Sequence, residues 1–188
     1  MKLSIENESN IKLIEFSEDH LYNPLYYEWL KDYDTMKYIG RDEYLKPFPF
    51  AIVEEYINKI WRRNDIVFFA IYHESDFIGT FKIGDIDSHN SIADIGILIG
   101  HKSYKGKGLS KDVMKIGCEY AFNELSIRKL KGGCFKQNIP MNKLFLATGF
   151  VLEGVIRKSY LFENDYLDHH LYGMFYNEFR DRLTQQNK

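Results

Sequence analysis

The chain has 188 residues, of which 45% are hydrophobic and 28% charged, and its formal net charge at pH 7 is −2. This length predicts one domain with a substantial core, and no apolar run approaches the ~18 residues that a membrane span requires. The nearly balanced charge argues against nucleic acid as the main partner, because proteins that follow phosphate backbones carry a broad basic face.

The cysteines and the first residues indicate the cellular compartment of the protein. The two cysteines, Cys118 and Cys134, form no pattern with other Cys or His residues that suits zinc. We therefore expect reduced, buried thiols in a cytoplasmic protein, with no metal site. The first eight residues, Met-Lys-Leu-Ser-Ile-Glu-Asn-Glu, lack the apolar segment of a secretory signal, and no such signal is expected.

The first third of the chain predicts one strand followed by helices. Residues 11–16 read as a short strand, and Ser17, followed by two acids, is typical of a helix N-cap. Helices are expected at about residues 20–31, interrupted or bent near Pro24, and at about 51–63. The apolar stripe of the second helix consists of Ile52, Tyr56, Ile60 and Trp61.

Aromatic residues are dense in the same third. Most are expected to pack in the core, because aromatics at helical spacing usually face inward. The others are candidates to line a ligand pocket, in which rings stack on a sugar or base and an acid attracts a cationic amine. The aromatics are Tyr22, Tyr26, Tyr27, Trp29, Tyr33, Tyr38, Tyr44, Phe48 and Phe50. The acids are Asp32, Asp34, Asp42 and Glu43.

The middle of the chain is predicted to be β structure that gives way to a helix. Residues 66–72 and 77–83 flank a polar Glu-Ser-Asp turn and should form an antiparallel hairpin. Residues 92–99 continue the meander after a loop at 85–91. From residue 109 to 125 the apolar period becomes helical, with a stripe at residues 109, 113, 116, 120 and 121.

The last third completes a mixed fold. We expect a strand, a short helix that ends at Gly149, and two strands around a Glu-Asn-Asp turn, at residues 129–135, 140–148, 150–157 and 166–176. The helix between 92–99 and 129–135 predicts that these two strands pair in parallel through a right-handed crossover. The expected fold class is α+β, layered α/β/α, with a mixed, mostly antiparallel sheet. The polar residues 177–188 are expected to be a frayed tail.

Residues 94–111 carry the main functional signal: Asp-Ile-Gly-Ile-Leu-Ile-Gly-His-Lys-Ser-Tyr-Lys-Gly-Lys-Gly-Leu-Ser-Lys. A β-branched strand runs through a basic glycine turn into the start of a helix. Gly106 and Gly108 permit a tight turn, and the helix adds unpaired N–H groups and the positive end of its dipole. The stretch is locally positive because of Lys102, Lys105, Lys107 and Lys111. This pattern predicts a cradle for a phosphate group.

Two familiar phosphate-binding folds do not fit this turn. A dinucleotide-binding fold places its glycine turn after the first strand, whereas this turn follows the fourth. A P-loop needs a Gly-Lys-Ser/Thr sequence at a set spacing, which the chain lacks.

Two segments together resemble the GCN5-related N-acetyltransferase (GNAT) superfamily. Residues 104–109, Tyr-Lys-Gly-Lys-Gly-Leu, look like its acetyl-CoA pyrophosphate loop, Gln/Arg-x-x-Gly-x-Gly/Ala. Residues 138–150, Asn-Ile-Pro-Met-Asn-Lys-Leu-Phe-Leu-Ala-Thr-Gly-Phe, resemble the family's downstream Asn-x-x-(Ser/Ala)-x-x-Leu-Tyr-x-x-x-Gly-Phe segment. The segments 28–32, 152–155 and 165–168 look like the ribosomal-protein-acetylating RimJ/RimL branch, so the resemblance spans nearly the whole chain.

The resemblance implies a single GNAT domain over residues 1–188, with the acyl-CoA N-acyltransferase fold and a splay between the central parallel strands. The free strand edge would pair with pantetheine like an added strand. The implied coenzyme-binding residues are Ile97, Leu98, Ile99, Lys105, Gly106, Lys107, Gly108, Leu109, Ser110, Asn138 and Phe145. N–H groups of residues 105–110 would hold the pyrophosphate, Asn138 the pantetheine arm, and Lys105 or Lys111 the 3′-phosphate. In the alternative reading, Asn138 is a helix-entry residue and the lysines are solvated.

The implied reaction is direct attack of a primary amine on acetyl-CoA in a ternary complex, without a metal. The amine would belong to a protein N-terminus, a polyamine, an amino-sugar nucleotide or an antibiotic. It must lose a proton first, so a carboxylate, or a water held by one, is the expected base. Asp94 is the candidate because it matches an acidic position in similar sequences, although a solvent-facing or strand-edge acid is an equal alternative. The other residues left open as the base are His89, His169, His170 and Glu43.

Two positions depart from the family pattern. Phe145 stands where many relatives have a tyrosine thought to protonate the departing CoA thiolate, and phenylalanine has no proton to give. Ser103 replaces Gln or Arg, which puts a side-chain phosphate contact there in doubt. Phe145 also leaves open a degenerate acyl-CoA-binding sensor without turnover. Cys134 as an acyl-carrying nucleophile is disfavoured, because no paired histidine is evident.

The expected partners follow from this reaction. They are coenzyme A and a small-molecule or peptide amine, with neither nucleic acid nor membrane, and a homodimer is left open.

Overall fold

The computed structural model describes residues 4–6 and 9–186, and in these residues one mixed sheet holds eight strands in the order β1-β2-β3-β4-β5-β6-β8-β7. The strands are β1 (Ser4–Glu6), β2 (Ile11–Glu15), β3 (Val67–His73), β4 (Asp76–Asp87), β5 (Ile92–Ile99), β6 (Lys129–Phe135), β7 (Val151–Phe162) and β8 (Asp165–Phe175). β5 and β6 pair in parallel, and the other neighbouring strands pair antiparallel. The predicted mixed, mostly antiparallel sheet is confirmed.

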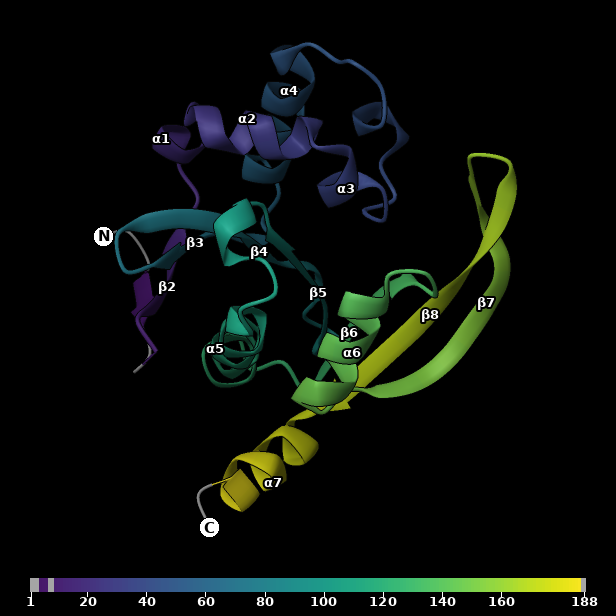
Figure 1. Ribbon diagram of the computed structural model, residues 1–188. Coiled ribbons are helices and arrows are strands. Elements are labelled where there is room, and N and C mark those ends of the chain that lie inside the picture. Colours follow the sequence, from purple (N-terminus) through teal and green to yellow (C-terminus); the bar gives the residue numbers. More distant parts are fainter. Residues whose placement is uncertain (1–3, 7–8, 187–188) are drawn as a thin grey trace.

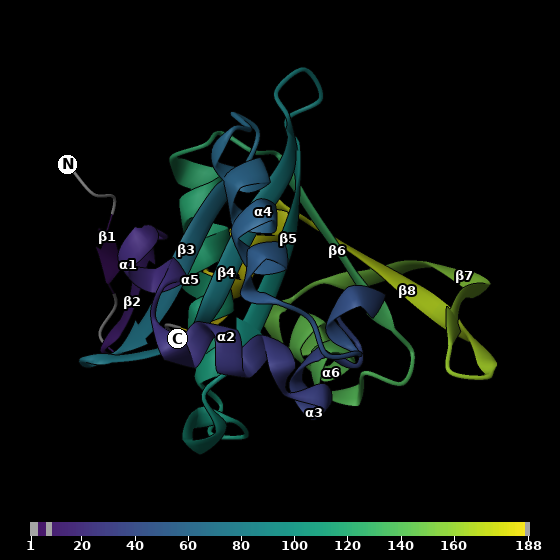
Figure 2. The same ribbon diagram turned by 90° about the horizontal axis from the view of Figure 1, so that it is seen from above.

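Helices cover both faces of the sheet, which confirms the α/β/α layering (Figure 1). One face carries α1 (Glu18–Leu21), α2 (Pro24–Lys31), α3 (Tyr33–Met36) and α4 (Phe50–Trp61). The other carries α5 (Leu109–Asn123), α6 (Ile139–Thr148) and α7 (Tyr176–Gln186). Short 3₁₀ turns lie at Asp42–Tyr44 and Lys102–Tyr104. Seen from above, β7 and β8 extend together beyond the rest of the sheet (Figure 2).

Alternating side chains on the central strands fill two separate cores. Successive residues of a strand point to opposite faces of the sheet. On β3, Phe69 and Ile71 therefore pack with α5, whereas Phe68 and Ala70 pack with α1 to α4. Burial of this apolar surface on both faces holds the helices to the sheet.

The parallel pair separates soon after it forms. β5 and β6 are paired only where residues 92–94 face residues 129–131. β5 stays paired with β4 as far as Ile99, and β6 stays paired with β8 as far as Phe135. Over residues 95–99 the opposite edge of β5 therefore has no strand partner in the described chain. This is the splay that the resemblance implied.

Three details differ from the sequence predictions. The segment 177–186, expected as a frayed tail, belongs to α7, in which Phe179 is buried; residues 187–188 lie outside the described residues. β4 extends to Asp87, into the expected loop. The buried residues of α4 are Val53, Ile57 and Ile60, and Trp61 is 39% exposed, so the predicted stripe is shifted around the helix.

Two elements were not anticipated at all, β1 and α3. Both are short and depend on pairing or capping partners elsewhere. In the described residues, no helix is both long and apolar enough to cross a membrane.

Candidate active site

The glycine turn leads directly into α5. Gly106 has φ +75° and Gly108 has φ +85°. Both therefore adopt the left-handed conformation, which is strained for a residue with a side chain. Gly108 is the N-cap of α5, and a Cβ at either glycine would meet no heavy atom within 4 Å. The N–H groups of Leu109 and Ser110, in the first turn of α5, have no backbone acceptor in the described part of the chain. The turn therefore presents free donors to an open space, as an anion cradle does.

Two of the four lysines around this turn are already held by Asp32, at the corner between α2 and α3. Lys102 Nζ lies 2.9 Å and Lys105 Nζ 3.7 Å from the Asp32 carboxylate. Hydrogen bonds from the Thr35 hydroxyl and from Lys102 lower the pKa of Asp32 to about 2. Lys111 has no ion pair in the described residues, so it is freer than Lys105 to meet a further anion.

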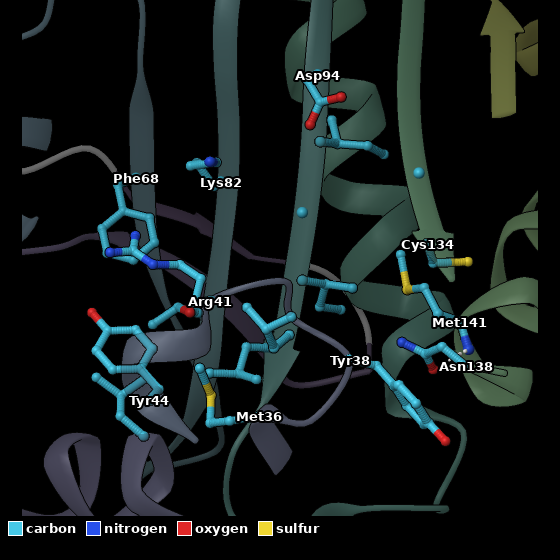
Figure 3. Close-up of a pocket in the computed structure, with 18 of the residues that line it drawn as sticks. Met36, Tyr38, Arg41, Tyr44, Phe68, Lys82, Asp94, Cys134, Asn138 and Met141 are labelled. Carbon is cyan, nitrogen blue, oxygen red and sulfur yellow. Dashed lines mark hydrogen bonds between the residues drawn. The ribbon is translucent and has the colours of Figure 1, made fainter. Parts of the chain in front are cut away.

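A cavity of about 250 Å³ lies beside β5, under the helices of the first third (Figure 3). One side is formed by β4 and β5, and the far side by residues across the splay. The residues from the sheet are Phe68, Thr80, Lys82, Asp94, Ile95, Gly96, Ile97 and Leu98. The residues across the splay are Gly133, Cys134, Asn138 and Met141. The cavity thus joins the predicted pantetheine edge, Asp94 and Asn138 in one space.

The aromatic segment contributes to this cavity only in part. Tyr26, Tyr38 and Tyr44 line it, and the six other singled-out rings do not. The acids of the same segment do not line it either: Asp32 binds the lysines, Asp34 pairs with Lys37, and Glu43 pairs with Arg41. The side chain of Asp42 lies outside the part of the chain that the structure describes. The three acids that can be placed, Asp32, Asp34 and Glu43, therefore lie outside the lining of this cavity and pair with cations.

Asp94 is the acid that does line the cavity. It faces Gly84 on β4 and Lys131 on β6, so it lies inside the sheet and not at a strand edge. Burial raises its pKa to about 6, against the opposing effects of Lys82 and Lys131. A carboxylate with this pKa is ionised at pH 7 and yet basic enough to accept a proton. Asp94 is half-buried and its side chain lines the cavity.

The other bases left open lie outside the lining of the cavity. His89 is exposed in the turn between β4 and β5. His169 packs on the ring of Phe135, at 5.5 Å between centroids, and burial lowers its pKa. His170 Nδ1 is hydrogen-bonded to Asn142 Oδ1 at 2.7 Å. Asp94 is therefore the geometric choice among the five.

The remaining predicted residues divide between cavity and core. Asn138 lines the cavity and also caps α6, because its side chain accepts a hydrogen bond from Met141 N–H at 3.3 Å. Phe145 is fully buried and stacked on Tyr172, with 4.7 Å between ring centroids, so its expected contact with a coenzyme is not supported. Cys134 lines the cavity, but burial raises the pKa of its thiol to about 12, which disfavours a nucleophilic thiolate.

Sequence reasoning missed two cationic residues of the cavity, Arg41 and Lys82. Lys82 could have been noticed, because it interrupts the otherwise apolar stretch Phe-Ile-Gly-Thr-Phe-Lys-Ile of β4. Arg41 follows Gly40 in an irregular segment and had no such signal. In the described residues, no group of three or more His, Cys, Asp or Glu side chains is placed to hold a metal ion.

The comparisons with known proteins agree with this geometry. Residues 10–151 match the model of the acetyltransferase (GNAT) domain family. A prophage-derived uncharacterized N-acetyltransferase, YokL, of Bacillus subtilis is 24% identical over 127 residues, covering 68% of this chain and 71% of that protein.

Two solved structures share the fold. The spermidine N-acetyltransferase of Vibrio cholerae, in complex with CoA and spermine, has a TM-score of 0.82 at 20% identity and covers 92% of this chain and 99% of its own. RimL, a ribosomal L7/L12 alpha-N-protein acetyltransferase, has a TM-score of 0.80 at 18% identity and covers 93% and 95%. The predicted resemblance, including its RimL-like relatives, is confirmed, and this chain belongs to the acetyltransferase (GNAT) family of acyltransferase enzymes.

Proposed function

We propose that the protein transfers an acetyl group from acetyl-CoA to a primary amine by direct attack in a ternary complex. The observation that supports this proposal is that one path along β5 leads from Asp94 and the cavity, by the unpaired edge over residues 95–99, to the glycine turn that follows the strand. A coenzyme bound along this path would present its thioester at the cavity.

The coenzyme would be held mostly by backbone groups. N–H groups of residues 106–110 would bind the pyrophosphate, since the N–H of Lys105 already donates to the carbonyl of Lys102. Residues 97–99 would hydrogen-bond the pantetheine arm as a neighbouring strand does. Asn138 lies across the splay from this edge, where its amide can meet the same arm. Lys111 is the better candidate for the 3′-phosphate, because Lys105 is held by Asp32 and by the Thr35 hydroxyl.

The reaction needs only modest chemistry from the side chains. Asp94, directly or through a water, would take the proton that the ammonium must lose before it attacks. Positioning supplies much of the rate, since orientation alone is worth effective molarities of up to ~10⁵ M or more. Phe145 supplies no proton, and a thiolate with an intrinsic pKa of about 8.5, by analogy with cysteine, leaves without one.

The acceptor amine is open among four classes: a protein N-terminus, a polyamine, an amino-sugar nucleotide and an antibiotic. The structural neighbours act on spermidine and on a ribosomal protein, so the first two classes have a precedent within the fold. The competing proposal is an acyl-CoA-binding sensor without turnover, for which the substitution at Phe145 is the favouring observation.

The test is an acetyl-transfer screen with peptides, polyamines and amino sugars, measured by release of free CoA thiol and by mass spectrometry of the amine. We expect thiol release that depends on an amine and an acetylated product. Calorimetric binding of CoA without turnover across the panel would support the sensor. Calorimetry that detects no CoA binding would contradict both proposals.

A further inference from the structure

The cavity beside β5 carries more positive than negative charge. Among its lining residues, the charged side chains are Arg41, Lys82 and Asp94. An acceptor that brings only positive charge would be attracted by Asp94 and repelled by Lys82 and by Arg41, whose charge Glu43 offsets in part. The identity of the acceptor therefore depends on how the two cations are placed.

Arg41 is held in one orientation by rings and by an acid. Its guanidinium carbon lies 4.1 Å from the ring centroid of Tyr56 and 5.0 Å from that of Tyr44. Glu43 accepts hydrogen bonds from Nε, at 2.8 Å, and from Nη2. The remaining guanidinium edge, which includes Nη1, has no hydrogen-bond acceptor in the described residues. Such a planar, oriented edge suits a carboxylate or a phosphate.

Tyr44 adds a buried hydroxyl beside this guanidinium (Figure 3). Its side chain lines the cavity, the residue is 4% exposed, and its hydroxyl has no hydrogen-bond partner in the described chain. A buried hydroxyl without a partner is unfavourable, so its presence points to a ligand that supplies one. Burial raises the pKa of Tyr44 to about 12, which keeps the group a donor at neutral pH.

Lys82 completes the positive end of the cavity. It is paired across the strands with Phe68 and Gly96, and it lies on the same face as Asp94 because Gly84 is paired with Asp94. Its ammonium has no ion pair in the described residues, and Figure 3 shows it between the Asp94 carboxylate and the Arg41 guanidinium. The cavity floor below it is open, since a Cβ on Gly96 would meet nothing within 4 Å.

We infer that the acceptor is a small primary amine that also carries an anionic group, a carboxylate or a phosphate. The anion binds Arg41, Lys82 and the Tyr44 hydroxyl while the amine faces Asp94. Polyamines are poor acceptors, because their further ammonium groups would lie against Arg41 and Lys82. This inference rests on the proposed acetyl transfer and narrows its substrate class.

Matched pairs of amines test the inference. O-phosphoethanolamine is compared with ethanolamine, β-alanine with its amide, and spermidine is added as a polycation. The readouts are kcat/KM for thiol release and the thermal shift of the protein in the presence of CoA. For the preferred anionic group, we expect kcat/KM of the anionic amine to exceed that of its neutral partner by roughly 10-fold or more. One hydrogen bond to a charged group accounts for a factor of this size. Comparison of the phosphate pair with the carboxylate pair shows which of the two anionic groups the cavity prefers.

Variants then locate the preference. Tyr44→Phe removes only the hydroxyl, and Arg41→Gln removes the guanidinium charge; each should lower the anionic-to-neutral ratio by roughly 10-fold. Arg62→Gln, at an exposed position after α4, is the matched control and should keep the ratio. The Tyr44 variant keeps the ring, so it tests the inference even if the Arg41 variant unfolds.

Three outcomes overturn the inference. The first is a higher kcat/KM for spermidine or for the neutral partners, which would leave the proposed acetyl transfer intact. The second is an anionic preference that both variants leave unchanged. The third is neither turnover nor a thermal shift with any amine, and in that case calorimetry of CoA alone shows whether the proposed function fails as well.

Discussion

Asp94 shows how burial sets the chemistry of one residue. Its carboxylate is largely removed from water beside β4 and β6, and this desolvation raises its pKa to about 6. The charged and titratable groups that face it are Lys82, Lys131 and Asp85; the two lysines lower the pKa and Asp85 raises it. A base of this strength is deprotonated at neutral pH and can receive a proton from an approaching ammonium.

Replacing Asp94 by Asn should reduce activity and raise stability together. We expect kcat/KM to fall by roughly 10²–10⁴ and the rise of rate with pH through about 6 to disappear. Because the folded state raises the pKa of this acid, the folded protein loses stability as pH rises from about 4 to about 6. At pH 7 the Asn variant should therefore unfold at a higher temperature, with a gain of up to about 3 kcal/mol.

The control for this prediction is Asp85→Asn. Asp85 is exposed and pairs with Arg63 at 2.7 Å, and its charge raises the pKa of Asp94. This variant should keep the rise of rate with pH, and the rise should occur at a slightly lower pH. If the rise of rate with pH persists unchanged in Asp94→Asn, Asp94 is excluded as the base.

The start of α5 shows how a helix can leave backbone donors unpaired. A helix N-terminus is usually capped by a side chain, but Gly108 caps α5 without one and leaves the first-turn N–H groups to an external anion. Asp32 fixes the turn from outside through Lys102 and Lys105. The element is thus held in position while its donors stay free.

Gly108→Ala should weaken coenzyme binding beyond its effect on folding. The left-handed backbone at φ +85° should make the variant less stable by about 1–2 kcal/mol. Gly149→Ala, at φ +101° after α6, carries a similar backbone strain outside the loop and serves as the control. Calorimetry should show the Kd for CoA rising roughly tenfold in the first variant only. An equal Kd in both variants would remove the loop from the coenzyme site.

Helix α6 is tied to the sheet by the side chain of Asn142. Its amide nitrogen donates to the carbonyls of Phe135, at 3.0 Å, and of Asn138, at 2.8 Å. Its oxygen accepts from the Tyr172 hydroxyl at 2.7 Å and lies 2.7 Å from His170 Nδ1. This one residue thereby joins β6, β8 and the cavity residue Asn138.

Asn142→Leu should therefore destabilise the fold by more than the loss of a single hydrogen bond would. We expect a decrease of about 3 kcal/mol in the free energy of unfolding, because several buried polar groups lose their partner. Tyr172→Phe removes one donor and should reduce this free energy by about 1 kcal/mol. Urea unfolding of both variants measures the difference, and equal losses would show that the other bonds of Asn142 contribute nothing.

At the scale of the whole molecule, the C-terminal helix closes the main core. Phe179 is 5% exposed and packs on Phe122 of α5, with 5.2 Å between ring centroids. Arg182 donates to the carbonyl of Ala147 at 2.7 Å, which joins α7 to α6. The last described helix is therefore part of the folded domain.

Phe179→Ala should reduce the free energy of unfolding by about 3–5 kcal/mol, as expected for truncating a buried aromatic side chain. Arg180→Ala, its exposed neighbour, should change this free energy by less than about 0.5 kcal/mol. Thermal or urea unfolding measures both. A loss below about 1 kcal/mol for Phe179→Ala would indicate that α7 frays, as the sequence had suggested.

Local features made much of this structure predictable. Strand and helix periods identify β3, β5, α5 and β6, because each period reflects which side of one segment faces apolar surroundings. The glycine turn was recognisable because positive φ and a missing cap side chain are properties of a few adjacent residues. The parallel pairing of β5 and β6 followed from the handedness of one crossover.

The composition of the cavity could not be predicted in the same way. Arg41, Lys82 and Asp94 come from separate segments, and only the packing of the α2–α4 layer on the sheet brings them together. The same packing places Asp32 beside the lysines of the turn and buries Phe145 in the core. The sequence by itself determined most of the order of elements, the glycine turn and the family resemblance, because these depend on neighbours along the chain. The charge of the cavity was decided by the tertiary structure, because electrostatic interactions depend on distance in space.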